Sequence, residues 1–199
     1  MQIQRPLSEQ PTPPEATKVF SGVIFDVYQW QQKLFNGETA TFEKLKRADT
    51  VLVIPVTPEG KILMVHDEQP GKAPFVGFAG GEAKPGEAVE ETAARELREE
   101  TGYQAANFSL LEAVQPFSKV DWAVYTLVAH GCVPVSAQEL DGGEKISLQE
   151  VSFEELVELA LREDFHEKSL TMEVLRAKLD PARMARLKKN ILGGLDFLA

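Results

Sequence analysis

This chain of 199 residues has little cysteine and no long apolar run. Its single cysteine, Cys132, excludes a disulfide within the chain and is typical of a reducing compartment. The opening stretch MQIQRPLSEQPTPPEATK contains no apolar core of the kind that a secretory signal needs. No other stretch approaches the length of a membrane-spanning helix. We therefore expect a cytoplasmic protein with no membrane partner.

Basic residues are also in short supply. Lysine and arginine number 21 against 31 acidic residues, which gives a formal net charge of −10 at pH 7. Such a surface repels a polyphosphate backbone, so we expect no nucleic-acid partner. The same charge repels a small phosphorylated substrate unless a cation mediates the contact.

Turn signals and hydrophobic periodicity divide the chain. Two strand-like segments flank Asn36 and Gly37, a pair of residues that strongly indicates a β-hairpin. Further strand patterns alternate with helical ones. Gly102 is suited to end one helix as a left-handed cap, and Ser152 with Glu155 to open another as a capping box. Pro181 is suited to open the last helix. The fold class that we expect is α+β, an α/β/α sandwich with a sheet between helices. The expected parts are a flexible arm or one that orders on contact (1–16), an antiparallel β module (17–47), the main domain (48–165) and a helical extension (166–199).

The most informative stretch is GGEAKPGEAVEETAARELREETGY, from Gly80 to Tyr103. Its glycines have the spacing of a phosphate-binding P-loop. That motif requires lysine followed by serine or threonine, whereas Glu87 and Ala88 stand here. Carboxylates at this position would repel phosphate, so a P-loop is excluded.

The charged run that follows is predicted to be a helix, from about residue 87 to 101, and a solvated face is the ordinary reading of such a run. At about 100° per residue, however, Val89, Ala93 and Leu97 form one apolar stripe. Glu100 falls inside this stripe and Glu96 lies at its edge. Two adjacent carboxylates that face a core are costly unless a cation lies between them. Oxygen ligands favour a hard divalent ion, so we expect Mg²⁺, with Mn²⁺ possible.

The spacing of eight residues in this stretch resembles the Nudix box: Gly81, Glu87, Arg95, Glu96, Leu97, Glu99, Glu100 and Gly102. Tyr103 is a soft departure, because the family usually has a bulky aliphatic residue there. The box covers 23 residues, and the order of the predicted strands around it also resembles the Nudix fold.

The resemblance implies roles for the residues of the box. Glu96 and Glu100 would be the main metal ligands, Glu99 would assist in the site, and the backbone carbonyl of Gly80 would complete the shell. Arg95 would support the site together with the structural residues Glu87, Gly81 and Gly102. Nudix enzymes hydrolyse a nucleoside diphosphate linked to another group, and a metal ion lets an acidic site accept this acidic substrate.

Parts of the chain outside the box resemble the ADP-ribose pyrophosphatase branch of the family. The antiparallel module precedes the main domain as it does in that branch, and Pro116 stands fourteen residues after Gly102. The segment EKISLQEVSFEEL resembles the stretch after the branch's catalytic loop, which makes Glu144 the candidate general base. Glu139 and Asp141 share the loop and stay open as alternatives.

Three departures separate the chain from that branch. Pro70 and then Lys72 stand where an arginine usually grips phosphate, and Ala79 replaces the proline before the box. After Pro116, FSKVDW replaces Ser-Pro-Gly. The broader class, a nucleoside diphosphate sugar hydrolase, is therefore predicted ahead of ADP-ribose itself.

The remaining expectations concern substrate contacts and assembly. Arg47 and Lys72 are candidates for binding phosphate. In the resembled branch aromatic residues of this module stack on the base, which makes Trp30 and Tyr28 candidates for that contact, whereas their alternating pattern favours packing in a core or dimer. Apolar strands of the module predict a homodimer. Two other functions stay open. A nucleoside triphosphate or dinucleotide pyrophosphohydrolase is disfavoured by the extra module, and a non-catalytic nucleotide-sugar sensor is disfavoured by the intact box.

Overall fold

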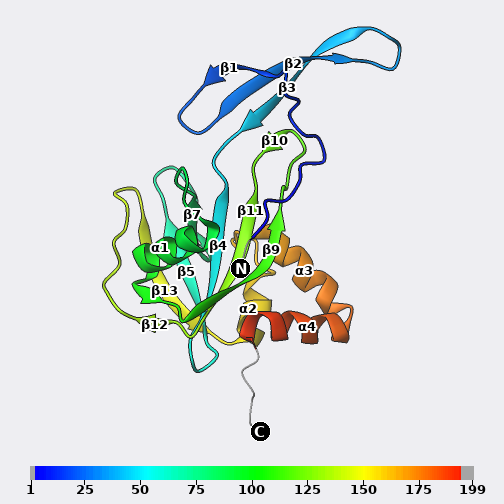
Figure 1. Ribbon diagram of the computed structural model, residues 1–199. Helices are drawn as coiled ribbons and strands as arrows, with labels where there is room; N and C mark the ends of the chain where they lie inside the picture. Colours follow the sequence, from blue (N-terminus) through cyan, green and yellow to red (C-terminus); the bar gives the residue numbers. More distant parts are fainter. Residues whose placement is uncertain (1–2, 194–199) are drawn as a thin grey trace.

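The elements of the computed structural model, which describes residues 3–193, form an α+β fold (Figure 1). This confirms the predicted fold class. The strands are β1 (Thr17–Ser21), β2 (Asp26–Lys33), β3 (Thr39–Lys46), β4 (Thr50–Val56), β5 (Ile62–Glu68), β6 (Phe75–Gly77), β7 (Ala79–Glu82), β8 (Tyr103–Gln104), β9 (Asn107–Val114), β10 (Val120–Asp121), β11 (Val124–His130), β12 (Val133–Pro134) and β13 (Lys145–Val151). The helices are α1 (Val89–Thr101), α2 (Phe153–Leu159), α3 (Lys168–Lys178) and α4 (Pro181–Leu192).

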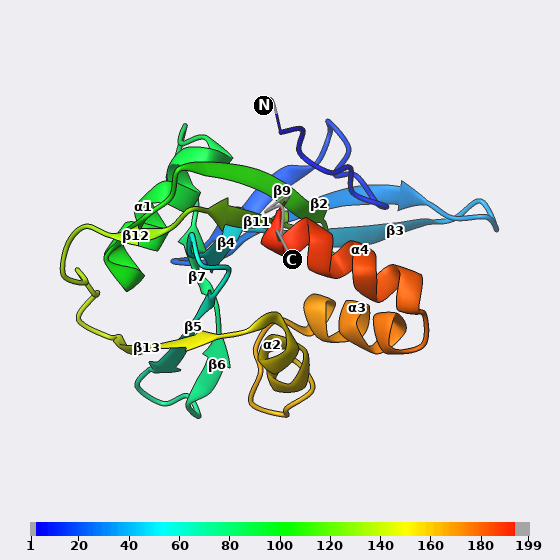
Figure 2. The same cartoon turned by 90° about the horizontal axis from the view of Figure 1, so that it is seen from below.

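The main sheet has the order β13-β5-β4-β11-β9, with β6 paired to β5 and β7 to β4. Strand β11 runs parallel to β4, and its other partner, β9, is antiparallel. Helix α1 covers one face of this sheet and the helices α2, α3 and α4 cover the other (Figure 2). The sheet is apolar on both faces, because each of its central strands packs against helices on both sides.

Local signals fix the helix ends. Gly102 ends α1 with φ 75°, which confirms the predicted left-handed cap. Ser152 and Glu155 form the predicted capping box of α2. Pro181 opens α4, with the Asp180 carboxylate accepting hydrogen bonds from the first turn.

The N-terminal module is an antiparallel sheet of β1, β2 and β3, and it projects from the rest of the molecule (Figure 1). Gly37, with φ 87°, lies in the turn between β2 and β3, so the predicted hairpin is confirmed. A fourth strand, β10, joins β3 in parallel from the main part of the chain. The projecting sheet is therefore built from two separate stretches of sequence.

Residues 5–10 run alongside the junction between this module and the main sheet. Arg5 forms ion pairs with Asp49 at 2.7 Å and Asp121 at 2.9 Å. Lys44, whose side chain is buried, donates a hydrogen bond to the Ser8 hydroxyl at 2.6 Å. The division of the chain into an arm, a module, a main domain and an extension stays a prediction.

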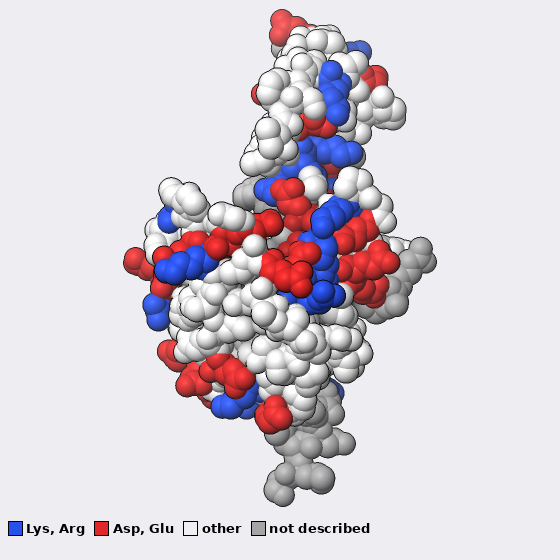
Figure 3. All heavy atoms as spheres, turned by 90° about the vertical axis from the view of Figure 1, so that its left-hand side faces the viewer, with Lys and Arg blue, Asp and Glu red and all other residues white. Residues whose placement is uncertain are grey.

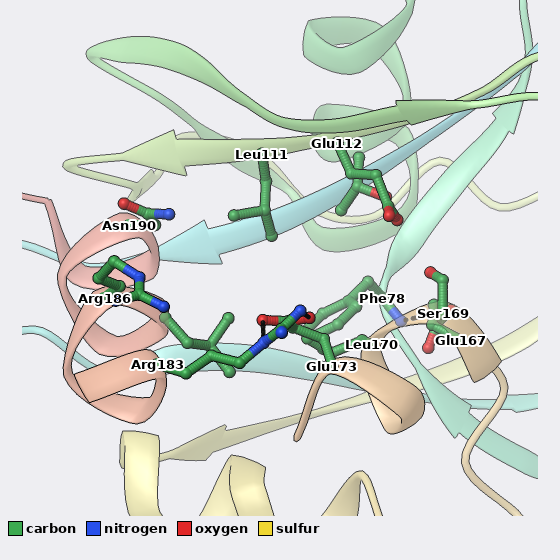
Figure 4. A pocket seen from close by; sticks show the side chains of 12 residues that line it. Phe78, Leu111, Glu112, Glu167, Ser169, Leu170, Glu173, Arg183, Arg186 and Asn190 are labelled. Carbon is green, nitrogen blue, oxygen red and sulfur yellow. Dashed lines mark hydrogen bonds and ion pairs between the residues drawn. The ribbon is translucent and has the colours of Figure 1, made fainter. Parts of the chain in front are cut away.

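Helices α3 and α4 leave a cavity of about 410 Å³ against the sheet (Figure 4). Leu111, Leu170 and Leu187 give it apolar walls, and Arg183 and Glu173 form a bidentate ion pair at its side. The cavity lies on the sheet face opposite α1. In the described residues, no helix is long and apolar enough to cross a membrane.

Candidate active site

Two glycines allow strand β7 to lie directly beneath helix α1. A Cβ atom at Gly80 would collide with the backbone oxygen of Val51 on β4, and one at Gly81 would collide with the Glu96 carboxylate. A larger residue at Gly80 would push the strand away from the sheet, and one at Gly81 would displace the Glu96 carboxylate. The glycines therefore bring the backbone of β7 and the carboxylates of α1 together.

Arg95 joins the loop before α1 to the acids of that helix. Its guanidinium donates to Glu87 at 2.9 and 3.1 Å, to Glu96 at 2.6 Å and to Glu99 at 3.0 Å. It also donates to the backbone oxygen of Glu82 at 3.0 Å. Because of the hydrogen bonds from Arg95, the pKa of Glu87 is lowered to about 2. This single arginine partly neutralises the acidic helix and braces the loop.

Glu96 and Glu100 are both only 8% exposed, although both are carboxylic acids. The Gly80 backbone N–H donates to Glu100 Oε2 at 3.2 Å. Burial raises the pKa of Glu96. Burial, followed by the negative charges of Glu96 and Glu144, raises the pKa of Glu100 to about 9. The helical spacing predicted this buried pair correctly.

Asp67 on β5 is an acid of this region that the sequence did not single out. It is 6% exposed, and its Oδ1 has no hydrogen-bond partner in the described part of the chain. Its charge contributes to the raised pKa values of Glu100 and Glu144. The available signal was an aspartate within the apolar strand KILMVHDE.

The donor set fits a hard divalent cation. The side chains are carboxylates, the negative charge around Glu100 is in excess, and Asp67 retains an unpaired buried oxygen. Within residues 3–193, no group of three acidic, histidine or cysteine side chains is already arranged to hold a metal ion. The Glu96 carboxylate accepts a hydrogen bond from Arg95, so a bound cation would compete with the arginine for this carboxylate.

The loop of residues 136–144 places its acids differently. Glu144 is partly buried, which raises its pKa, and its charge in turn acts on Glu96 and Glu100. Glu139 instead forms an exposed ion pair with Arg98 at 3.4 Å. Of the acids considered in this loop, Glu144 is the one whose charge reaches the buried pair.

Arg47 is the predicted substrate-binding residue that lies beside the box. Its guanidinium forms an ion pair with the Glu82 carboxylate, and the backbone of Glu82 is held by Arg95. Acidic and basic side chains gather on this face, between the projecting module and the body (Figure 3). Glu82 was not identified from the sequence, because it is not a fixed residue of the box.

The recorded ring contacts of the other predicted substrate residues are with side chains outside the box. Lys72 has its ammonium 3.7 Å from the centre of the Phe75 ring. Trp30 is buried in the module and packs against Phe42. Tyr28 lies in the same module, on β2.

The arrangement of β7 and α1 is accompanied by a family match: the model of the NUDIX domain matches residues 46–173. This chain belongs to the Nudix family. The Nudix chain is 31% identical over 172 residues to the ADP-ribose pyrophosphatase of Bacillus subtilis, a match that covers 85% of this chain and 93% of that protein. It is 32% identical over 148 residues to the methanol dehydrogenase activator of Bacillus methanolicus, covering 73% of this chain and 76% of the relative.

A solved structure also resembles this Nudix fold. The crystal structure of an ADP compounds hydrolase superposes with a TM-score of 0.69 at 22% identity, covering 91% of this chain and 99% of that one. The chain is a Nudix pyrophosphohydrolase, an enzyme that acts on phosphorus anhydrides of small nucleotide derivatives. Nudix hydrolases generally use divalent metal ions.

Proposed function

We propose that this Nudix enzyme hydrolyses the diphosphate bond of an ADP-ribose-like nucleoside diphosphate sugar with Mg²⁺ as its cofactor. The products are a nucleoside monophosphate and a sugar phosphate. The observation that carries the proposal is the buried pair Glu96 and Glu100 beneath the Gly80 strand, within an intact box. The similarity to an ADP-ribose pyrophosphatase along 93% of that protein's length supports the substrate class.

The metal ligands in this proposal are Glu96, Glu99, Glu100 and the backbone carbonyl of Gly80. Bound Mg²⁺ would neutralise phosphate oxygens and acidify a water molecule. Arg95 keeps Glu99 and the loop in place around the acids. Arg95 also donates a hydrogen bond to Glu96 at 2.6 Å. This hydrogen bond would shift when Glu96 binds the cation.

Glu144 accepts the proton of the attacking water in this mechanism. The water oxygen bonds to one phosphorus of the diphosphate, the bond from that phosphorus to the bridging oxygen breaks, and the departing phosphate carries the bridging oxygen. Burial raises the pKa of Glu144, which makes its carboxylate a better proton acceptor than an exposed glutamate. Its loop contains Gly142 and Gly143, so it has the freedom to approach the substrate.

Two further features complete the proposal. Arg47 contacts a substrate phosphate, since the acid with which its guanidinium pairs, Glu82, is exposed and readily displaced. The enzyme works as a homodimer joined through the projecting module. The cytoplasmic location expected from the sequence remains a prediction.

The direct test is a screen of nucleotide sugars, dinucleotides and nucleoside triphosphates with Mg²⁺, in which a phosphatase releases phosphate from the products. ADP-ribose and related sugars should give the highest kcat/KM, and excess EDTA should abolish the signal. Glu59→Gln, in an exposed turn, is the matched control for variants of the box acids. Faster hydrolysis of triphosphates or dinucleotides would replace the proposed substrate class, and binding of nucleotide sugars without any turnover would indicate a sensor.

A further inference from the structure

An aromatic cluster surrounds Arg47 at the junction between the projecting module and the main sheet. The centre of the Arg47 guanidinium lies 4.9 Å from the centre of the Trp122 ring and 5.7 Å from that of Phe25. The Phe117 ring stacks on Trp122, with centroids 6.2 Å apart and planes inclined by 18°. Arg47 and these three rings together are called the aromatic cluster below. Phe117 and Trp122 belong to FSKVDW, the segment in which this chain departs from the resembled branch.

Arg47 retains unused hydrogen-bonding capacity. Its Nε is buried and has no hydrogen-bond partner in the described residues. The Glu82 side chain with which it pairs is 51% exposed, and an ion pair to such a group contributes little. A phosphate carries more charge than a carboxylate and matches the guanidinium fork, so it would displace Glu82 readily.

The aromatic cluster is continuous with the box. Glu82 is the last residue of β7, and its backbone oxygen accepts a hydrogen bond from Arg95. Gly80 lies two residues earlier, which is ~7 Å along an extended strand. Arg47 thus marks the start of a path that leads from the phosphate-cleaving site toward the aromatic rings.

Phe117 offers a flat apolar surface at the end of this path. Its side chain is 58% exposed, whereas Trp122 beneath it is held by a hydrogen bond from its indole N–H to the Thr50 hydroxyl at 2.9 Å. The Trp122 ring therefore provides a fixed support, and the outer face of Phe117 remains for a ligand. A ring with this support and a neighbouring arginine suits a nucleobase that is attached to a phosphate.

We propose that the aromatic cluster is the subsite for the nucleoside half of the substrate. The base stacks on the exposed face of Phe117, and Arg47 binds the adjacent phosphate in place of Glu82. This inference rests on the proposed function and deepens it, since it assigns the preference for an aromatic base to residues outside the Nudix box. The sugar phosphate half makes no contact with Phe117.

Steady-state kinetics with Phe117→Ala test the stacking contact. KM for ADP-ribose should rise roughly 5- to 100-fold, the range for loss of one base–aromatic stack, with little change in kcat. Phe117→Tyr should restore the parental KM because it keeps the ring. Leu179→Ala removes an exposed apolar side chain between α3 and α4, away from the aromatic cluster and the module, and should behave as the parent.

Product inhibition separates the two halves of the substrate. Phe117→Ala should weaken inhibition by AMP by the same factor as it raises KM, and should leave inhibition by ribose 5-phosphate unchanged. Equal weakening of both products would overturn the proposal, because it would indicate a general disturbance of the site. A parental KM together with dissociation of an oligomer would assign the Phe117 ring to contacts between copies and would also overturn it.

Fluorescence provides a measurement that does not need turnover. The chain has two tryptophans, so Trp30→Phe leaves Trp122 as the only reporter. AMP should change the emission of Trp30→Phe saturably, whereas ribose 5-phosphate should not, and Trp122→Phe should lose the response. Hydrolysis of ADP-ribose without any AMP response would reject the subsite and leave the proposed function standing. An AMP response without hydrolysis of any nucleotide would reject the proposed function and leave the subsite standing.

Discussion

At the scale of one residue, Glu100 shows that a group required by the site lowers the stability of the fold. It is buried, it accepts a hydrogen bond from Gly80, and it lies near the charges of Glu96, Glu144 and Asp67. A core position without a function would hold an apolar or uncharged group. A bound metal ion relieves the unfavourable burial and mutual repulsion of these carboxylates, and this relief contributes to its binding energy.

Replacing Glu100 by glutamine should therefore have opposite effects on activity and stability. Turnover with Mg²⁺ should fall by at least ~10²-fold, because a charge that stabilises the transition state is lost. In EDTA the variant should unfold at a higher temperature than the parent. The difference should grow as pH rises from about 5 to 9, because the folded state holds the Glu100 proton up to a pKa of about 9 and the unfolded state releases it near the ordinary 4.5.

Thermal unfolding of the parent and Glu100→Gln in EDTA, across that pH range, measures this effect. Glu59→Gln should follow the parent in both experiments, since Glu59 is exposed. Parallel stability curves for the parent and Glu100→Gln, or near-parental turnover in the variant, would contradict the role given to Glu100.

Glu144 is expected to act in proton transfer and not in metal binding. Glu144→Gln should lower kcat by roughly 10²–10⁴-fold, while the Mg²⁺ concentration for half-maximal activity barely changes. Glu139→Gln and Asp141→Asn are matched changes in the same loop and should be milder. If one of these two variants lost activity instead, the base would be that neighbour. Full activity in all three would place the base within the box, at Glu99.

The site could be predicted from the sequence where one helix determines it. Regular spacing places Glu96 and Glu100 on the apolar side of α1, and the structure buries both. Asp67 and Glu82 come from strands that approach the helix only after the chain has folded, so no local pattern indicated their proximity. Trp30 illustrates the same limit, because its alternating strand pattern did not show which face of the module would be covered.

At the scale of elements, the close approach of β7 to α1 depends on Gly81. Gly81→Ala should displace the Glu96 carboxylate, raise the Mg²⁺ concentration needed for half-maximal activity and destabilise the fold by about 1–3 kcal/mol. Gly142→Ala is a suitable control for stability, because a Cβ there meets no neighbouring atom. Chemical denaturation and Mg²⁺ titration of activity measure the two effects. Parental values for Gly81→Ala in both would show that the strand and the helix are not tightly coupled.

Elements with strong local signals were predicted better than those held by distant partners. The α1 cap at Gly102, the capping box of α2 and the hairpin around Gly37 all matched, because each depends on a few neighbouring residues. Strands β6 and β7 read FVG and AGGE, which have little strand preference, and they form by pairing with β5 and β4. The pairing of β10 with β3 likewise joins residues that are far apart in the sequence.

At the scale of the whole molecule, the module presents an exposed apolar surface that is suited to bind a partner. It projects away from the main sheet, so the rest of the chain does not cover it (Figure 1). Several of its large apolar side chains are more than half exposed: Val19, Phe20, Val23, Ile24 and Phe35. Exposed apolar residues gathered in this way mark interaction surfaces, and a second copy of the same chain is the commonest partner.

We therefore predict a homodimer joined through this module. Light scattering should give a mass of twice 22.0 kDa for the parent. Phe20→Asp should shift the mass toward that of one chain, because a charge on this exposed strand surface must be desolvated when two copies meet. Leu179→Asp adds the same charge at an even more exposed apolar position between α3 and α4, away from the module, and should leave the dimer intact. A concentration-independent mass near 22.0 kDa for the parent would show that the module acts within a single chain, and dissociation by Leu179→Asp alone would move the interface to the C-terminal helices.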